Sequence, residues 1–213
     1  MRPVCVCAVL FTTVLGGGFA SQRPAETKTD EASVEVYADA EAYTVYAAAL
    51  AIDSWYWEGS NMILILREIP PREWVLAAPA DALPGDATFL KEMEPVFKSF
   101  SEANATPRLL NSDVDLHRAH RFVRIADLDE AFKKGEEGKG HDVWQGFHEV
   151  FPNAAGYLML SAVGFNPSKT LALVYVEHRC GNRCGGANYY VLQKLGGVWV
   201  KYFRREQSAT SKL

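Results

Sequence analysis

The residues best suited to chemistry form an acidic and imidazole cluster in the middle of the chain: Asp113, Asp115, His117 and His120. If Ser112 caps a helical turn, Asp113, His117 and His120 fall at i, i+4 and i+7 on one face. Carboxylate and imidazole ligands suit zinc, so this spacing indicates a metal site. A solvated helix edge, with Asp113 favoured by the helix dipole, explains the same residues. We favour the solvated edge.

A second candidate site is a loop rich in glycine and arginine in the C-terminal third. Glycine-rich turns can point successive backbone N–H groups at one anion, and arginine side chains would add charge-assisted hydrogen bonds. The residues of this weak anion site are Arg179, Gly181, Arg183, Gly185 and Gly186. A tight loop that needs glycine for positive φ angles is the alternative.

The same loop carries Cys180 and Cys184. In an oxidising compartment, two cysteines this close around a tight turn predict a small structural disulfide. A redox-active pair is the alternative. It is disfavoured because the spacing is not Cys-x-x-Cys and because no helix N-terminus follows to lower a thiol pKa.

Two neighbouring pairs could supply acid and base groups, His148 with Glu149 and Glu177 with His178. On a helix, the first pair points about 100° apart. On a strand, the second pair points to opposite faces. Each residue could line a cleft, but neither pair makes a good dyad by itself. We therefore assign no catalytic residue and expect no cofactor.

Two further motifs have a functional and a structural interpretation. Trp55, Tyr56 and Trp57 could stack on carbohydrate, although with Trp74 they are more typical of core anchors. Asn104-Ala105-Thr106 fits a glycosylation acceptor, relevant in a eukaryotic host.

The N-terminus predicts export. Arg2 precedes an uncharged run from Val4 to Leu15, which is shorter than the roughly 20 residues needed to span a bilayer. Three glycines and Gly18-Phe19-Ala20 follow, as at a signal-peptidase site. We predict a signal peptide over residues 1–20, a linker over 21–33 and one domain over 34–206. The mature protein is then secreted or periplasmic.

The composition of the chain restricts the classes of partner that it could bind. The chain has 213 residues, 22 basic and 26 acidic, and a net charge of −4. A mildly acidic chain without a basic stripe argues against nucleic acid and against an anionic membrane surface. After the leader, no segment reaches membrane-spanning length, and the partner, if there is one, would be another envelope or secreted protein.

The first two thirds of the chain predict helices separated by strands. An apolar stripe predicts a helix over 34–52, with Ser33 as its N-cap. Met62–Arg67 and Arg121–Ala126 are typical of strands. Three further helices are expected to begin at Asp86, Asp127 and Asp142. The first of them is expected to kink or break at Pro95. Residues 135–140 are expected to form a charged loop.

The last third predicts four strands: Tyr157–Gly164, Thr170–His178, Asn188–Leu195 and Val198–Arg204. Short turns between them, including Gly196-Gly197, are typical of antiparallel neighbours. The predicted fold class is therefore α+β, with N-terminal helices packed on a C-terminal antiparallel β-meander.

This C-terminal pattern is similar to that of a group of uncharacterised exported bacterial proteins. The likeness rests on segments between Trp144 and Tyr202, namely Val163–Asn166, Ala172–Val176, Cys180-Gly181, Cys184–Gly186, Tyr189-Tyr190 and Gly197–Trp199. The resemblance implies secretion and a β-meander, but no activity.

Together these patterns predict an exported, non-enzymatic binding or envelope-associated protein. The alternative is a hydrolase outside the cytoplasm that is metal-dependent, through Asp113, His117 and His120, or uses acid/base groups.

Overall fold

The computed structural model describes residues 34–52, 62–69, 83, 85–138 and 142–202. The predicted leader and linker, Ser33, Trp55, Tyr56, Trp57 and Trp74 lie outside these residues. The described part confirms the α+β class, since helices and mixed sheets each make up about 36 % of the structure. Among the described helices, none has both the length and the apolar character that crossing a bilayer requires.

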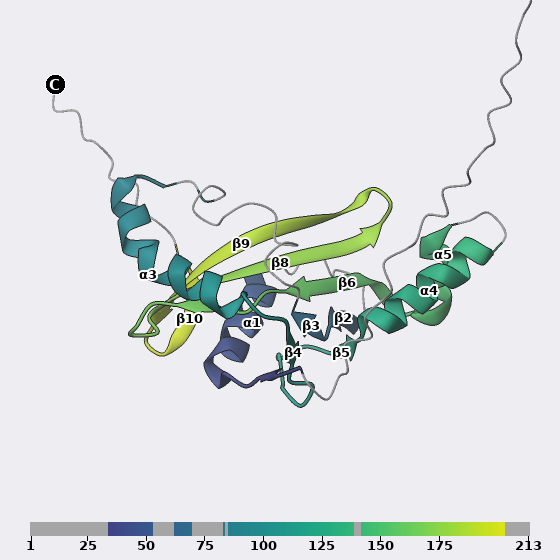
Figure 1. Ribbon diagram of the computed structural model, residues 1–213, viewed down its shortest axis with the longest axis horizontal. Coiled ribbons are helices and arrows are strands. Elements are labelled where there is room, and N and C mark those ends of the chain that lie inside the picture. Colours follow the sequence, from purple (N-terminus) through teal and green to yellow (C-terminus); the bar gives the residue numbers. More distant parts are fainter. Residues whose placement is uncertain (1–33, 53–61, 70–82, 84, 139–141, 203–213) are drawn as a thin grey trace, which may run out of the picture.

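The main sheet has seven strands in the order β10-β9-β8-β6-β2-β5, with β7 paired to β8 (Figure 1). Their bounds are β2 Met62–Leu66, β5 His120–Val123, β6 Ala154–Leu160, β7 Gly164–Phe165, β8 Leu171–Gly181, β9 Cys184–Leu195 and β10 Val198–Lys201.

The predicted meander is present, because β8, β9 and β10 are consecutive antiparallel neighbours and β6 pairs with β8 in the same sense. The sheet also extends beyond the meander. The apolar strand β2 lies parallel to both β5 and β6, which makes the sheet mixed. The first two thirds of the chain thus supply two strands of the sheet as well as helices that cover it.

A second, small sheet changes the expected start of the first helix. It has the order β1-β4-β3, formed by Val36–Tyr37, Arg108–Leu110 and Glu68–Ile69. The predicted helix over 34–52 therefore begins too early, and α1 spans Ala40–Ile52. Asp39 acts as the cap, since its Oδ1 accepts a hydrogen bond of 3.0 Å from the amide of Glu41.

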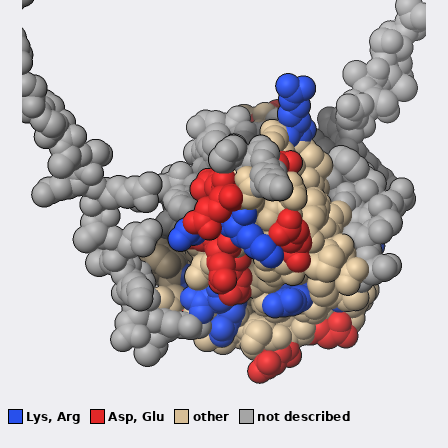
Figure 2. All heavy atoms as spheres, turned by 90° about the vertical axis from the view of Figure 1, so that its right-hand side faces the viewer, with Lys and Arg blue, Asp and Glu red and all other residues tan. Residues whose placement is uncertain are grey.

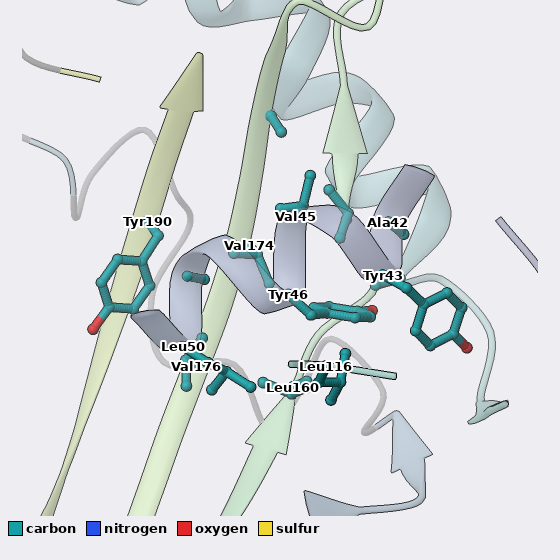
Figure 3. Packing of buried hydrophobic residues seen from close by; sticks show 14 of the residues in the cluster. Ala42, Tyr43, Val45, Tyr46, Leu50, Leu116, Leu160, Val174, Val176 and Tyr190 are labelled. Atoms are coloured by element: carbon teal, nitrogen blue, oxygen red, sulfur yellow. The ribbon is translucent and has the colours of Figure 1, made fainter. Parts of the chain in front are cut away.

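Helix α1 covers one face of the main sheet. Figure 3 shows Tyr46 and Leu50 of α1 beside Leu160 of β6 and Val174 and Val176 of β8. The Tyr46 hydroxyl donates a hydrogen bond of 2.8 Å to the carbonyl of Ser161, and complete burial raises the pKa of Tyr46 well above its usual value. The hydroxyl therefore stays protonated and ties α1 to the segment after β6.

The opposite face is covered by α3 (Ala87–Ala103), α4 (Ile125–Glu137) and α5 (Val143–Val150), which lie at the two ends of the sheet in Figure 1. Alternation along the strands separates the two faces. In β8, Val174 belongs to the α1 side, whereas Leu173 and Tyr175 pack under α3. In β2, Leu64 packs under α4 and α5.

The N-caps of two helices are confirmed. The Asp86 side chain accepts hydrogen bonds from the amides of Thr88 and Phe89, and Asp142 accepts one from Trp144. Helix α3 runs through Pro95 without splitting. Its buried residues are Phe89, Met93, Val96 and Phe100, whereas Phe97 is only half-buried.

The start of α4 differs from the prediction. Asp127 does not cap the helix, because α4 begins at Ile125 and Asp127 lies inside its first turn. There, Asp127 Oδ2 accepts a hydrogen bond of 2.9 Å from the amide of Arg124, the true N-cap. The strand before it is correspondingly shorter than predicted and ends at Val123.

The end of α4 extends into the predicted charged loop because two glycines let α4 and α5 approach closely. A Cβ on Gly146 would lie 2.3 Å from the Ala131 carbonyl oxygen, and one on Gly135 would lie 2.4 Å from that of Asp142. Gly135 is therefore a contact residue inside the helix and not the start of a loop.

Candidate functional site

The proposed metal ligands do not lie on a helix. Residues 111–119 form turns and bends, and His120 is the first residue of β5, so the expected helical face is wrong. Two short side-chain-to-backbone bonds shape this segment. Asn111 Oδ1 accepts from the amide of Asp113 at 3.0 Å, and Asp115 Oδ1 accepts from that of His117 at 2.7 Å. Such bonds compete with helix formation.

The three residues also face different surroundings. Asp113 and His117 are exposed, and the His120 ring is bonded through Nδ1 to the Arg118 carbonyl at 2.8 Å. Within the described ranges, no three His, Cys, Asp or Glu side chains lie close enough together to hold a metal ion. The structure therefore gives the metal prediction no support.

The predicted anion loop is the end of the β8–β9 hairpin. Gly185 and Gly186 continue β9 opposite Arg179 and His178, so their amides belong to an extended ladder and not to a concave nest. The guanidinium of Arg179 is engaged too, since its Nε donates to Glu177 Oε1 at 2.5 Å. Anion binding at this loop stays a prediction, and Arg183 in the exposed turn is its best remaining residue.

Cys180 and Cys184 lie at this hairpin end at disulfide distance, with a Cα–Cα separation of 5.0 Å. Gly181 pairs with Cys184 while Arg179 pairs with Gly185, so Cys180 occupies a β-bulge. Cys184 is exposed and Cys180 is half-buried.

Glu177 and His178 point to opposite faces, as expected for strand neighbours. Glu177 is 5 % exposed on the side of α3, where it also accepts a hydrogen bond of 3.0 Å from the Tyr175 hydroxyl. His178 lies on the α1 side, and burial lowers its pKa. Its Nδ1 is 3.7 Å from Cys180 Sγ. Both oxygens of Glu177 are thus used inside the protein.

Asn104 is unsuited to glycosylation in the folded chain because it is fully buried. Its Nδ2 donates to the carbonyls of Phe100, at 2.8 Å, and Ala162, at 3.0 Å. Its Oδ1 accepts from the amide of Ala162 at 2.8 Å. The side chain therefore joins the end of α3 to the segment that follows β6.

A pocket of about 440 Å³ opens between α4 and α5. Its lining comprises Lys134, Gly135, Glu137, Gly138, Gln145 and Glu149. Figure 2 views the side of the molecule that carries these helices and shows acidic and basic side chains next to one another, not a field of one sign. The pocket thus offers both hydrogen-bond donors and acceptors.

Within the pocket, Glu149 is held by both helices. Its Oε2 lies 3.2 Å from Lys134 Nζ, and its Oε1 accepts a bond of 3.2 Å from Gln145 Nε2. The hydrogen bond from Lys134 is the main cause of a lowered pKa for Glu149, with Gln145 contributing. His148 instead lies against aromatic rings, 5.3 Å from the Phe147 centroid. Glu149 therefore lines a cleft without His148.

Sequence reasoning named Glu149 but missed Lys134 and Gln145. Lys134 lies on α4, whereas Gln145 and Glu149 lie on α5. The contact between Lys134 and Glu149 therefore depends on the close approach of the two helices at Gly135 and Gly146. Glycines inside helical patterns are the one signal that could have indicated it.

Searches against family models, curated proteins and solved structures found nothing that matches this chain.

Proposed function

We propose that this chain is an exported, non-enzymatic binding or envelope-associated protein that takes a small polar ligand in the α4–α5 pocket. The leader pattern of residues 1–20 supports export. The cysteine pair at disulfide distance is compatible with it. The resemblance of the C-terminal pattern to exported bacterial proteins points the same way.

One observation carries the binding role: Glu149 contacts Lys134 across two packed helices and Gln145 along its own helix, which brings three polar side chains together in the pocket. An ammonium, an amide and an ionised carboxylate can accept from and donate to hydroxyl and amino groups of one ligand. Glu149 is charged at neutral pH, as any exposed glutamate is, and the hydrogen bond from Lys134 lowers its pKa further, which suits hydrogen bonding to a ligand and does not suit proton donation.

Export predicts a defined mature N-terminus. When the full chain is expressed in a bacterial host, we expect the exported protein to begin at Ser21 or within two residues of it, because the leader is removed. Intact mass and N-terminal sequencing of the periplasmic fraction and the medium provide the measurement. Full-length chain that retains Met1 and stays in the cytosolic fraction would contradict export.

Ligand binding predicts a rise in melting temperature. The probes are glucosamine, galactose and spermidine, which combine hydroxyl or amino groups in different proportions. We expect at least one of them to stabilise the mature protein, because a ligand that binds only the folded state raises its stability. The Lys134→Ala variant should weaken the binding of a neutral, hydroxyl-bearing probe such as galactose about tenfold, since it removes the ammonium that would donate a hydrogen bond to a ligand hydroxyl.

Lys98→Ala is the matched control, because Lys98 is an exposed lysine on α3 that pairs with Glu102 at 4.0 Å and does not line the pocket. This variant should bind as the wild type does. No shift with any probe, or equal losses in the two variants, would contradict the assignment. A chelator should leave the melting temperature unchanged; a drop would favour the metal-dependent hydrolase instead.

A further inference from the structure

The cysteine pair contributes little to holding its own hairpin. Strands β8 and β9 are already joined by a continuous antiparallel register from Leu171–Gln193 to Arg179–Gly185. A bridge that closes so small a loop removes less entropy from the unfolded chain than one that closes a long loop. The ladder therefore keeps the hairpin formed when the bridge is open.

The surroundings of the two sulfur atoms differ. Cys184 is exposed beside the Asn182-Arg183 turn. Cys180 is half-buried in the bulge, with its Sγ 3.7 Å from His178 Nδ1. An incoming thiolate therefore has access to Cys184, whereas an imidazole lies beside the sulfur that would leave.

From this asymmetry we propose that the Cys180–Cys184 pair is a thiol–disulfide exchange site for an external dithiol. A thiolate of the dithiol attacks Cys184 Sγ, forming a mixed disulfide and breaking the bond to Cys180. Cys180 leaves as a thiolate, to which the His178 N–H donates a hydrogen bond. The second thiol of the dithiol, deprotonated, then attacks its own sulfur in the mixed disulfide. Cys184 departs as a thiolate, and the dithiol is oxidised to a disulfide by two electrons.

His178 is expected to affect the rate of reduction because it lies beside Cys180 Sγ, the sulfur that leaves. A thiol with a lower pKa leaves faster, and a hydrogen bond to the thiolate lowers the thiol pKa. We expect the His178→Gln variant to be reduced about three- to tenfold more slowly in the native state. The two proteins should be reduced equally fast in 6 M urea, where the contact is absent.

The experiment uses the oxidised mature protein with dithiothreitol as the dithiol probe. Thiols are counted over time by the mass added by a maleimide, with circular dichroism recorded in parallel. We expect two thiols to appear while the fold persists. The matched control is Asn182→Ala in the same hairpin, which should react at the wild-type rate. A pair that opens only after denaturation, or a His178→Gln rate equal to wild type, would overturn the proposal.

A second measurement does not depend on how well any variant folds. With glutathione as a monothiol probe, peptide mapping of the trapped mixed disulfide should find glutathione on Cys184. Glutathione found mainly on Cys180 would overturn the proposed direction of attack. Free cysteines in the exported protein, titrated after denaturation without a reductant, would show that no disulfide exists to exchange.

Discussion

Trp199→Ala is expected to lower the free energy of unfolding by about 3–5 kcal/mol, the usual cost of removing a buried tryptophan. Trp199 is 6 % exposed on β10 and lies in the cluster beneath α1. Its ring centroid is 5.9 Å from that of Phe165, and its indole N–H donates to Glu41 Oε1 at 2.5 Å. The variant therefore loses packing area and also leaves a carboxylate of α1 with one partner fewer.

Urea denaturation of the two proteins, followed by fluorescence and circular dichroism, measures this loss as a lower midpoint at similar slope. Val198→Ala is the control on the same strand, since Val198 is 63 % exposed, and it should change stability by no more than about 0.5 kcal/mol. An unchanged midpoint for Trp199→Ala would show that Trp199 is not part of the core.

Asn104→Ala is expected to lower the free energy of unfolding by about 2–5 kcal/mol, because it leaves buried groups without partners. The amide and the carbonyl of Ala162 both bond to the Asn104 side chain. The Phe100 carbonyl loses the hydrogen bond from the Asn104 side chain, although it keeps the one from the Asn104 backbone N–H at 3.1 Å.

Calorimetry of the variant gives the measurement as a drop in melting temperature. The matched control is Asn182→Ala, in which the same side chain is removed from the exposed hairpin turn. It should melt close to the wild type. Equal melting temperatures for Asn104→Ala and the wild type would mean that the buried amide contributes nothing to stability.

Features that depend on neighbouring residues could be predicted from the sequence. Asp86 and Asp142 were identifiable as caps because a cap needs only a short polar side chain and the amides just after it. The β9–β10 hairpin was identifiable for the same reason, since Gly196-Gly197 supplies the positive φ angles of its turn, 57° and 87°.

Features that depend on residues far apart in the chain could not be predicted from the sequence. Strands β1, β3 and β4 are too short to show a period, and Val36 continues the apolar spacing of α1 although it pairs with Leu109. The site prediction failed through a different competition. In the segment before β5, the amide oxygen of Asn111 and the carboxylate of Asp115 accept hydrogen bonds from backbone amides two residues further on. No spacing rule for metal ligands reveals this competition.

The central place of β2 has a consequence for biosynthesis. Its partners β5 and β6 both follow it in the chain, and β6 is completed only at Leu160. During synthesis, the apolar strand Met62–Leu66 is therefore made before either of its partner strands, so the core of the nascent chain cannot form until β6 has been synthesised. A fragment that stops short of β6 is therefore expected to aggregate, because the apolar strand β2 then lacks one of its two partner strands.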